Sequence, residues 1–257
     1  MPTIKELRLI CQNSEESPSW KSQSFEGRFN RIFSIYLTWI FIKLPFTPNQ
    51  ITVFGTLLYL FAASLFVFNI FIFNVVALIL IFISFLLDAV DGELARYRKM
   101  SKGGGVGGAY VEPVTHDIMY AFFFLPISIG ATVEFNNIFL EFNNVFLLLA
   151  AFIATISKLL FRLAEFRYDA LVRFWAEQKG ESVGYKQNVK TPPTIFYFIF
   201  RNFFTGTGIF TLLIPAVLLS RLDLFLYFYA LSFFLLWCYK MFRQQVRIRN
   251  KLKSSDF

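Results

Sequence analysis

Histidine and cysteine are scarce in this chain, which holds one histidine and two cysteines among 257 residues. The two thiols, Cys11 and Cys238, lie far apart in the sequence and show none of the short spacings typical of zinc ligands. A disulfide between them is not expected, and a reducing cytoplasmic environment suits both.

Charged residues are also few, at 16%, whereas hydrophobic residues make up 56% of the chain and include 36 phenylalanines. A mean hydropathy of +0.55 is too high for a soluble domain of this length. The sequence therefore predicts an all-α, multi-pass integral membrane protein. In such a protein the net charge of +8 reflects topology, so no nucleic-acid partner is expected.

The first 24 residues lack the short apolar core of a signal peptide, and we expect a loose or weakly helical arm there. Residues 25–43 interleave basic and apolar side chains, which predicts an amphipathic interfacial helix whose basic face meets anionic headgroups. Asn49 is the expected cap of the next helix. We therefore expect residues 1–44 to form a cytoplasmic arm and interfacial helix, and residues 45–257 to form a six-helix membrane domain.

Six apolar stretches are each close to the ~20 residues that cross a bilayer as a helix. They cover residues 51–68, 70–87, 109–132, 145–166, 194–219 and 224–242. Basic residues gather before the first stretch, between the second and third, between the fourth and fifth, and after the last, with only Arg221 on the other side. By the positive-inside rule, both termini and the segment between the second and third stretches face the cytoplasm.

Two carboxylates close the apolar run 75–87, and carboxylates are costly in a bilayer unless something compensates them. Asp88 and Asp91 are three residues apart, and Gly92 and Ala95 follow at four and seven, so all four share one helical face. That face carries two carboxylates at one end and only the small residues Gly92 and Ala95 at the other. It suits a hard divalent cation beside a slot for a phosphorylated ligand.

A second polar group follows in residues 112–117. Glu112 and His116 share a helical face, whereas Asp117 lies about 140° from Glu112 at ~100° per residue. His116 is therefore the better candidate for the site. The glycine run 103–108 follows a membrane helix and not a strand, so it predicts a flexible interhelical loop, with a backbone-amide phosphate cradle as the alternative.

These residues resemble the signature of the CDP-alcohol phosphotransferases, which is Asp-x-x-Asp-Gly-x-x-Ala-Arg, a loop, then Gly-x-x-x-Asp-x-x-x-Asp. The first half matches from Asp88 to Arg96, while Glu112 and His116 replace the last two acids after a longer loop. Residues 47–52 are similar to the Thr-Pro-Asn-x-x-Thr that opens the first membrane helix of that family. The likeness spans roughly residues 25–245.

The resemblance implies roles for the matching residues. Asp88, Asp91 and Glu112 would hold Mg²⁺ or Mn²⁺, as two ions, and His116 would deprotonate the acceptor alcohol, although it could equally ligate the metal. Arg96 would contact the pyrophosphate. The cytidine nucleotide would lie over a bare surface made by Gly92, Ala95, Arg96 and Gly108.

The implied activity is transfer of a substituted phosphate group from a CDP-alcohol, expected to be CDP-diacylglycerol, to an alcohol acceptor with release of CMP. This is a step of phospholipid biosynthesis at the cytoplasmic side of a cell inner membrane or its equivalent. Three alternatives stay open: a soluble CDP-polyol donor such as CDP-inositol, an inactive membrane scaffold, and an ion or polyol transporter, which would show broken helices or paired halves. A homodimer is a further open expectation.

Overall fold

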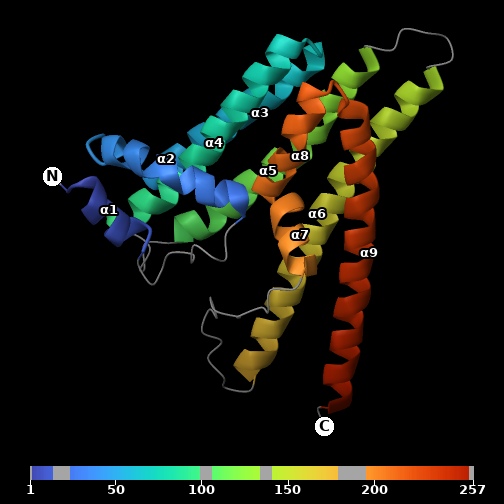
Figure 1. The fold of residues 1–257 in the computed structure, drawn as a ribbon. Helices are drawn as coiled ribbons and strands as arrows, with labels where there is room; N and C mark the ends of the chain where they lie inside the picture. Colours follow the sequence, from blue (N-terminus) through green and yellow to red (C-terminus); the bar gives the residue numbers. More distant parts are fainter. Residues whose placement is uncertain (1, 14–23, 99–105, 134–140, 179–194, 255–257) are drawn as a thin grey trace.

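The computed structural model describes residues 2–13, 24–98, 106–133, 141–178 and 195–254. Within these ranges the chain is helical and holds no β-strand, which confirms the expected all-α class. The helices, drawn in Figure 1, are α1 (Ile4–Cys11), α2 (Phe25–Phe41), α3 (Pro48–Leu65) with the short 3₁₀ helix Phe66–Phe68, α4 (Phe71–Tyr97), α5 (Val106–Val133), α6 (Glu141–Gln178), α7 (Ile195–Phe203), α8 (Gly206–Leu218) and α9 (Leu222–Ser254).

The N-terminal arm begins with a capped helix, the second of the two expectations for this polar stretch. Thr3 and Glu6 form a capping box: the Thr3 hydroxyl accepts from the Glu6 N–H at 3.3 Å, and the Glu6 carboxylate accepts from the Thr3 N–H at 2.7 Å. This pairing satisfies two amides that a helix start leaves free. Leu7 and Cys11 are buried, so α1 packs against the rest of the protein.

Helix α2 covers the stretch predicted as an amphipathic helix, but its faces are reversed. Its buried side carries Asn30, Arg31, Ser34 and Thr38, while the exposed side carries the aromatic residues Phe25, Phe29, Phe33 and Tyr36 (Figure 1 shows α2 across α4). The expectation that the basic face meets headgroups is wrong for Arg31, because this side chain is used inside the protein. The exposed aromatic face is the one suited to lipid.

Helices α3 and α4 form an antiparallel hairpin. Thr47, and not Asn49, caps α3, with its side chain accepting from the Gln50 N–H, and Pro48 occupies the first helical position, where its missing N–H costs nothing. The turn between the helices ends at Asn69, whose φ of 47° is left-handed, a conformation that asparagine tolerates better than most residues.

The core lies among α3, α4, α5, α6, α8 and α9. Aromatic rings fill its centre, with Phe66, Phe123, Phe124 and Tyr229 almost fully buried. The long helices α6 and α9 pack along each other (Figure 1), and Lys240 of α9 pairs with Glu165 of α6 at 2.8 Å. A bundle of this kind fixes α4 and α5, the two helices that carry the polar motif.

Five helices of the described chain are long and apolar enough to cross a membrane: those at Pro48–Phe68, Phe71–Tyr97, Tyr110–Thr132, Asn144–Gln178 and Leu222–Asn250. The chain is therefore a multi-pass membrane protein by length and composition. The remaining predicted stretch, 194–219, is split into α7, of nine residues, and the apolar helix α8, of 13 residues.

The split between α7 and α8 has identifiable partners. Thr205 caps α8 by accepting from the Gly208 N–H, and Lys158 of α6 donates to the Phe204 carbonyl at 2.7 Å. A Cβ at Gly208 would lie 2.8 Å from the Asn202 backbone, so only glycine fits this close turn. The sequence did not predict a broken helix, because nothing in residues 194–219 signals that Lys158 faces them.

Candidate functional site

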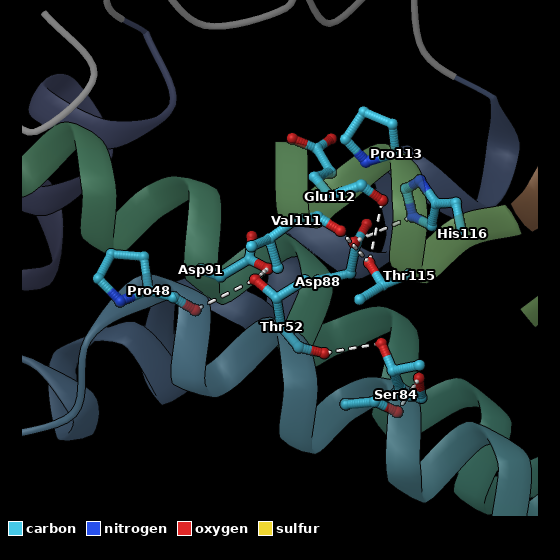
Figure 2. Close-up of polar contacts among 12 residues, drawn as sticks. Pro48, Thr52, Ser84, Asp88, Asp91, Val111, Glu112, Pro113, Thr115 and His116 are labelled. Carbon is cyan, nitrogen blue, oxygen red and sulfur yellow. Dashed lines mark hydrogen bonds and ion pairs between the residues drawn. The ribbon is translucent and has the colours of Figure 1, made fainter. Parts of the chain in front are cut away.

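The two aspartates of the motif lie in the last three turns of α4, opposite the start of α3. The helices approach closely at Gly55, where an added Cβ would lie 3.4 Å from the Leu87 Cβ and where Ser84 donates to the backbone carbonyl at 2.8 Å. This register brings the Thr52 hydroxyl within 2.5 Å of Asp91 Oδ2 (Figure 2). Asp91 is therefore held from the neighbouring helix.

The second half of the motif meets the first across the α4–α5 contact. His116 Nε2 lies 3.2 Å from Asp88 Oδ1, and both side chains are about one-third exposed (Figure 2). The structure thus brings together the predicted metal ligand Asp88 and the predicted base His116. An imidazole that takes up a proton here is stabilised by the carboxylate.

Glu112 and Asp117 point to different surroundings, as their helical spacing predicts. Glu112 is exposed on the same side of α5 as His116, within electrostatic range of Asp88. Asp117 instead forms an ion pair with Arg162 of α6, and Arg162 also contacts the Pro113 carbonyl at 3.4 Å. Asp117 therefore belongs to the α5–α6 contact. It lies outside the group formed by Asp88, Asp91, Glu112 and His116, which we call the acidic cluster.

The bare face of α4 is partly covered by Arg96. An added Cβ at Gly92 would lie 3.3 Å from Arg96 Nη1, and Ala95 is only half-buried. The Nε of Arg96 donates to the Cys11 carbonyl of α1 at 2.7 Å, a contact that the motif does not predict. The guanidinium is therefore anchored at one nitrogen and lies flat beside Gly92.

The glycine run 103–108, expected to contact the nucleotide through Gly108, is only partly described. Gly108 lies near the start of α5, and most of the glycine run, residues 103–105, lies outside the described residues. The phosphate-cradle alternative for that run is therefore not placed relative to Asp88 and His116.

The donor atoms of the acidic cluster are of the kind that bind a divalent cation. Three carboxylates and one imidazole offer oxygen and nitrogen donors of the kind that Mg²⁺ and Mn²⁺ accept, so the donor chemistry fits. Among the residues that the structure describes, however, no three such side chains are already grouped tightly enough to hold an ion. Asp88 is turned to His116 and Asp91 to Thr52, so the cluster is an open set of donors and not a closed cage.

Two contributors were missed in the sequence. Thr52 was noted as the end of the stretch 47–52, and its i+4 relation to Pro48 gave no hint that it also reaches Asp91. Glu93 occupies a variable position of the motif, yet it is 1% exposed and accepts three hydrogen bonds. The one sequence feature that pointed to a separate role for Glu93 is its position about 200° round the helix from Asp91, on the face opposite the cluster.

Neither protein-family models nor curated protein sequences give a significant match to this chain. An assignment of activity must therefore rest on the motif and on the geometry of the site.

Proposed function

We propose that this protein is a membrane-bound transferase that moves a substituted phosphate group from a CDP-alcohol to a second alcohol and releases CMP. The observation that carries the proposal is the 3.2 Å approach of His116 Nε2 to Asp88 Oδ1, which joins the two halves of the motif across separate helices. A chance pair of polar residues in a membrane bundle would not also place Asp91, Gly92 and Ala95 on the adjoining face.

The reaction requires a base, a way to neutralise phosphate charge and a site for the nucleotide. The acceptor oxygen bonds to the phosphorus that carries the donor alcohol, and the bond from this phosphorus to the bridging oxygen of CMP breaks. When Nε2 of His116 carries the proton that Asp88 accepts, Nδ1 is unprotonated and takes the hydroxyl proton. Arg96 would bind the pyrophosphate beside Gly92 and Ala95.

A divalent cation fits this proposal. Asp88, Asp91 and Glu112 would hold Mg²⁺ or Mn²⁺, as two ions, with Gly108 near the nucleotide. The cation supplies charge neutralisation on the transferring phosphate. Thr52 orients Asp91 for this role, as hydrogen-bonded partners of metal ligands do.

The proposed topology has six crossings, with α7 and α8 together forming the fifth. Both termini and the acidic site then face the cytoplasm, since basic residues gather on that side and Arg221 alone lies on the other among the residues that connect the crossings. The break between α7 and α8 is a broken helix of the kind that a transporter would show, but the Phe204 carbonyl at the break already accepts a hydrogen bond from Lys158 at 2.7 Å, which favours a structural role for it.

The membrane setting favours a lipid as donor, and CDP-diacylglycerol is the donor we propose. Incubation of the purified protein with CDP-diacylglycerol, CDP-inositol and other CDP-alcohols, each with Mg²⁺ or Mn²⁺ and a panel of acceptors, tests this. The expected result is CMP release with CDP-diacylglycerol and a new phosphodiester found by mass. CMP release with CDP-inositol alone would show that CDP-inositol, and not CDP-diacylglycerol, is the donor. Nucleotide binding without CMP release from any donor would identify an inactive scaffold.

A further inference from the structure

The carboxylate of Glu93 is turned away from the acidic cluster and fully enclosed. Its Oε1 accepts from Gln12 Nε2 at 2.7 Å and from Ser34 Oγ at 2.7 Å, and its Oε2 accepts from Thr38 Oγ1 at 2.6 Å. An enclosed carboxylate is costly unless hydrogen bonds replace those of water. Three donors from two other segments make Glu93 a junction between α4, α2 and the end of α1.

The same junction holds α1 against α2. Gln12 Nε2 also donates to the Arg31 carbonyl at 2.8 Å, and Arg31 Nη2 donates back to the Gln12 carbonyl at 3.2 Å. Beside these bonds, Leu7 and Cys11 of α1 are fully buried with Ile35 of α2. Apolar packing and a closed set of hydrogen bonds therefore fix the end of α1.

The fixed end of α1 is the part that contacts Arg96. The Cys11 carbonyl accepts from Arg96 Nε at 2.7 Å, which leaves Nη1 and Nη2 of the guanidinium beside Gly92. An arginine side chain has much rotamer freedom to lose, and anion binding by its planar fork depends on orientation. A carbonyl held in place at Nε reduces the number of orientations open to the guanidinium.

We propose that Glu93 is a positioning residue and that α1 is part of the substrate site. Glu93 holds the end of α1, and the Cys11 carbonyl then orients Arg96 for a phosphate-bearing ligand over Gly92. The ligand part of this inference rests on the proposed function, because the anion would be the pyrophosphate of a CDP-alcohol. The docking of α1 through Glu93 does not depend on it.

The docking is tested with Cys11 as a reporter in a Cys238→Ala background. Burial raises the pKa of the Cys11 thiol to about 11, so a maleimide should label it slowly at neutral pH. Glu93→Gln puts an amide donor where an acceptor is needed, and Thr38→Val removes one donor while keeping the Glu93 charge, which itself helps to raise the pKa of the Cys11 thiol. We expect labelling to become about tenfold faster or more in both variants, the scale of one lost hydrogen bond to a charged group.

The matched control is Glu165→Gln, which removes a carboxylate paired with Lys240 at 2.8 Å on α6 and α9, away from α1. Its labelling rate should equal that of the parent. Equal rates for Glu93→Gln and the parent would overturn the proposal. If Glu93→Gln does not fold, Thr38→Val, which removes one of the three donors, serves as the second variant, with the same two outcomes.

The effect on Arg96 is tested by nucleotide affinity and not by turnover alone. Glu93→Gln should weaken binding of CMP and of a CDP-alcohol about tenfold, raising KM with little change in kcat, because orientation of a binding group is lost. In an Arg96→Ala background the same substitution should change affinity little, since the group that it positions is gone.

A full tenfold loss in the Arg96→Ala background would show that Glu93 acts independently of Arg96 and would overturn the positioning role. Absence of any nucleotide binding by the parent protein would instead contradict the proposed function. In that case Cys11 labelling still decides whether Glu93 holds α1, so the two failures are distinct.

Discussion

His116 of α5 and Asp88 of α4 are linked by a 3.2 Å contact between Nε2 and Oδ1. A histidine held at one nitrogen by a carboxylate has a defined tautomer and ring orientation, which leaves the other nitrogen as the proton acceptor. Asp88 would therefore serve two roles, orienting the base and contributing an oxygen to the cation site.

Replacement of His116 by Ala should lower the chemical rate by about 10²–10⁴-fold, the usual contribution of a positioned base. Affinity for the CDP-alcohol should change little, since the imidazole acts on the acceptor. Single-turnover rates and equilibrium binding separate the two effects. His116→Asp, which restores an acid at this position, should retain more activity than His116→Asn. Loss of metal binding in His116→Ala, with the rate recovered at saturating metal, would make the imidazole a ligand.

The carboxylates should make activity dependent on a divalent cation. CMP release should vanish in excess EDTA and return with Mg²⁺ or Mn²⁺, and Asp91→Asn should reduce it to background because an acceptor oxygen is lost. The control Glu165→Gln, on α6, should behave as the parent. Full turnover in excess EDTA would contradict the proposal that a divalent cation is required.

Thr52 should matter although it carries no charge. Thr52→Val removes the hydroxyl that contacts Asp91 Oδ2 and should weaken apparent Mn²⁺ affinity by ~10–100-fold, as loss of a partner of a metal ligand does. Thr56→Val is the matched control, because the Thr56 hydroxyl donates only to the Thr52 carbonyl of its own helix, at 2.9 Å. Metal titrations of activity in which both variants match the parent would show that Asp91 needs no support from α3.

Ala95 tests the nucleotide site. The residue is half-buried on the face of α4 that also carries Gly92, so Ala95→Leu should fill the space proposed for the cytidine nucleotide. We expect CMP affinity to fall by about tenfold or more, since a large side chain in a fitted site costs at least ~1 kcal/mol. Calorimetric titration with CMP measures this, and thermal melting confirms that the variant is folded. Unchanged affinity would place the nucleotide elsewhere.

Glu26 of α2 should make stability depend on pH. Burial raises the pKa of this carboxyl to about 7, in spite of a hydrogen bond from Thr211. The folded state therefore holds a proton that the unfolded state, with a pKa near 4.5, releases. The stabilisation is complete below pH 4.5 and is lost as pH rises through 7, by on the order of 3 kcal/mol.

The measurement is the melting temperature of the detergent-solubilised protein between pH 5 and 8. Glu26→Gln keeps the neutral form at every pH and should flatten the decline seen in the parent. Identical pH profiles for the two proteins would show that Glu26 titrates normally in the folded state.

Hydrophobicity made most of this fold predictable, because five of the six predicted spans appear as long apolar helices. Helical spacing also correctly separated His116, which meets Asp88, from Asp117, which pairs with Arg162. Periodicity could not give the orientation of α2, since Arg31 and Thr38 are polar residues that find partners on other helices.

The break after α7 has local signals in Thr205 and Gly208, but the partner of the carbonyl at the break has none. That partner is Lys158, which lies 46 residues before Phe204. The anchoring of Arg96 by α1 likewise joins residues 85 apart in the sequence. Contacts of this range leave no local pattern, and no motif fixes them.

The break between α7 and α8 also constrains how the protein is made. On the proposed topology, two apolar pieces of nine and 13 residues must together enter the bilayer, and each is well short of the ~20 residues that insert unaided. The Phe204 carbonyl at the break gains its partner only when Lys158 of α6 is beside it. The segment 195–218 is therefore expected to integrate late, after α6, with the partly assembled bundle as its template during biogenesis.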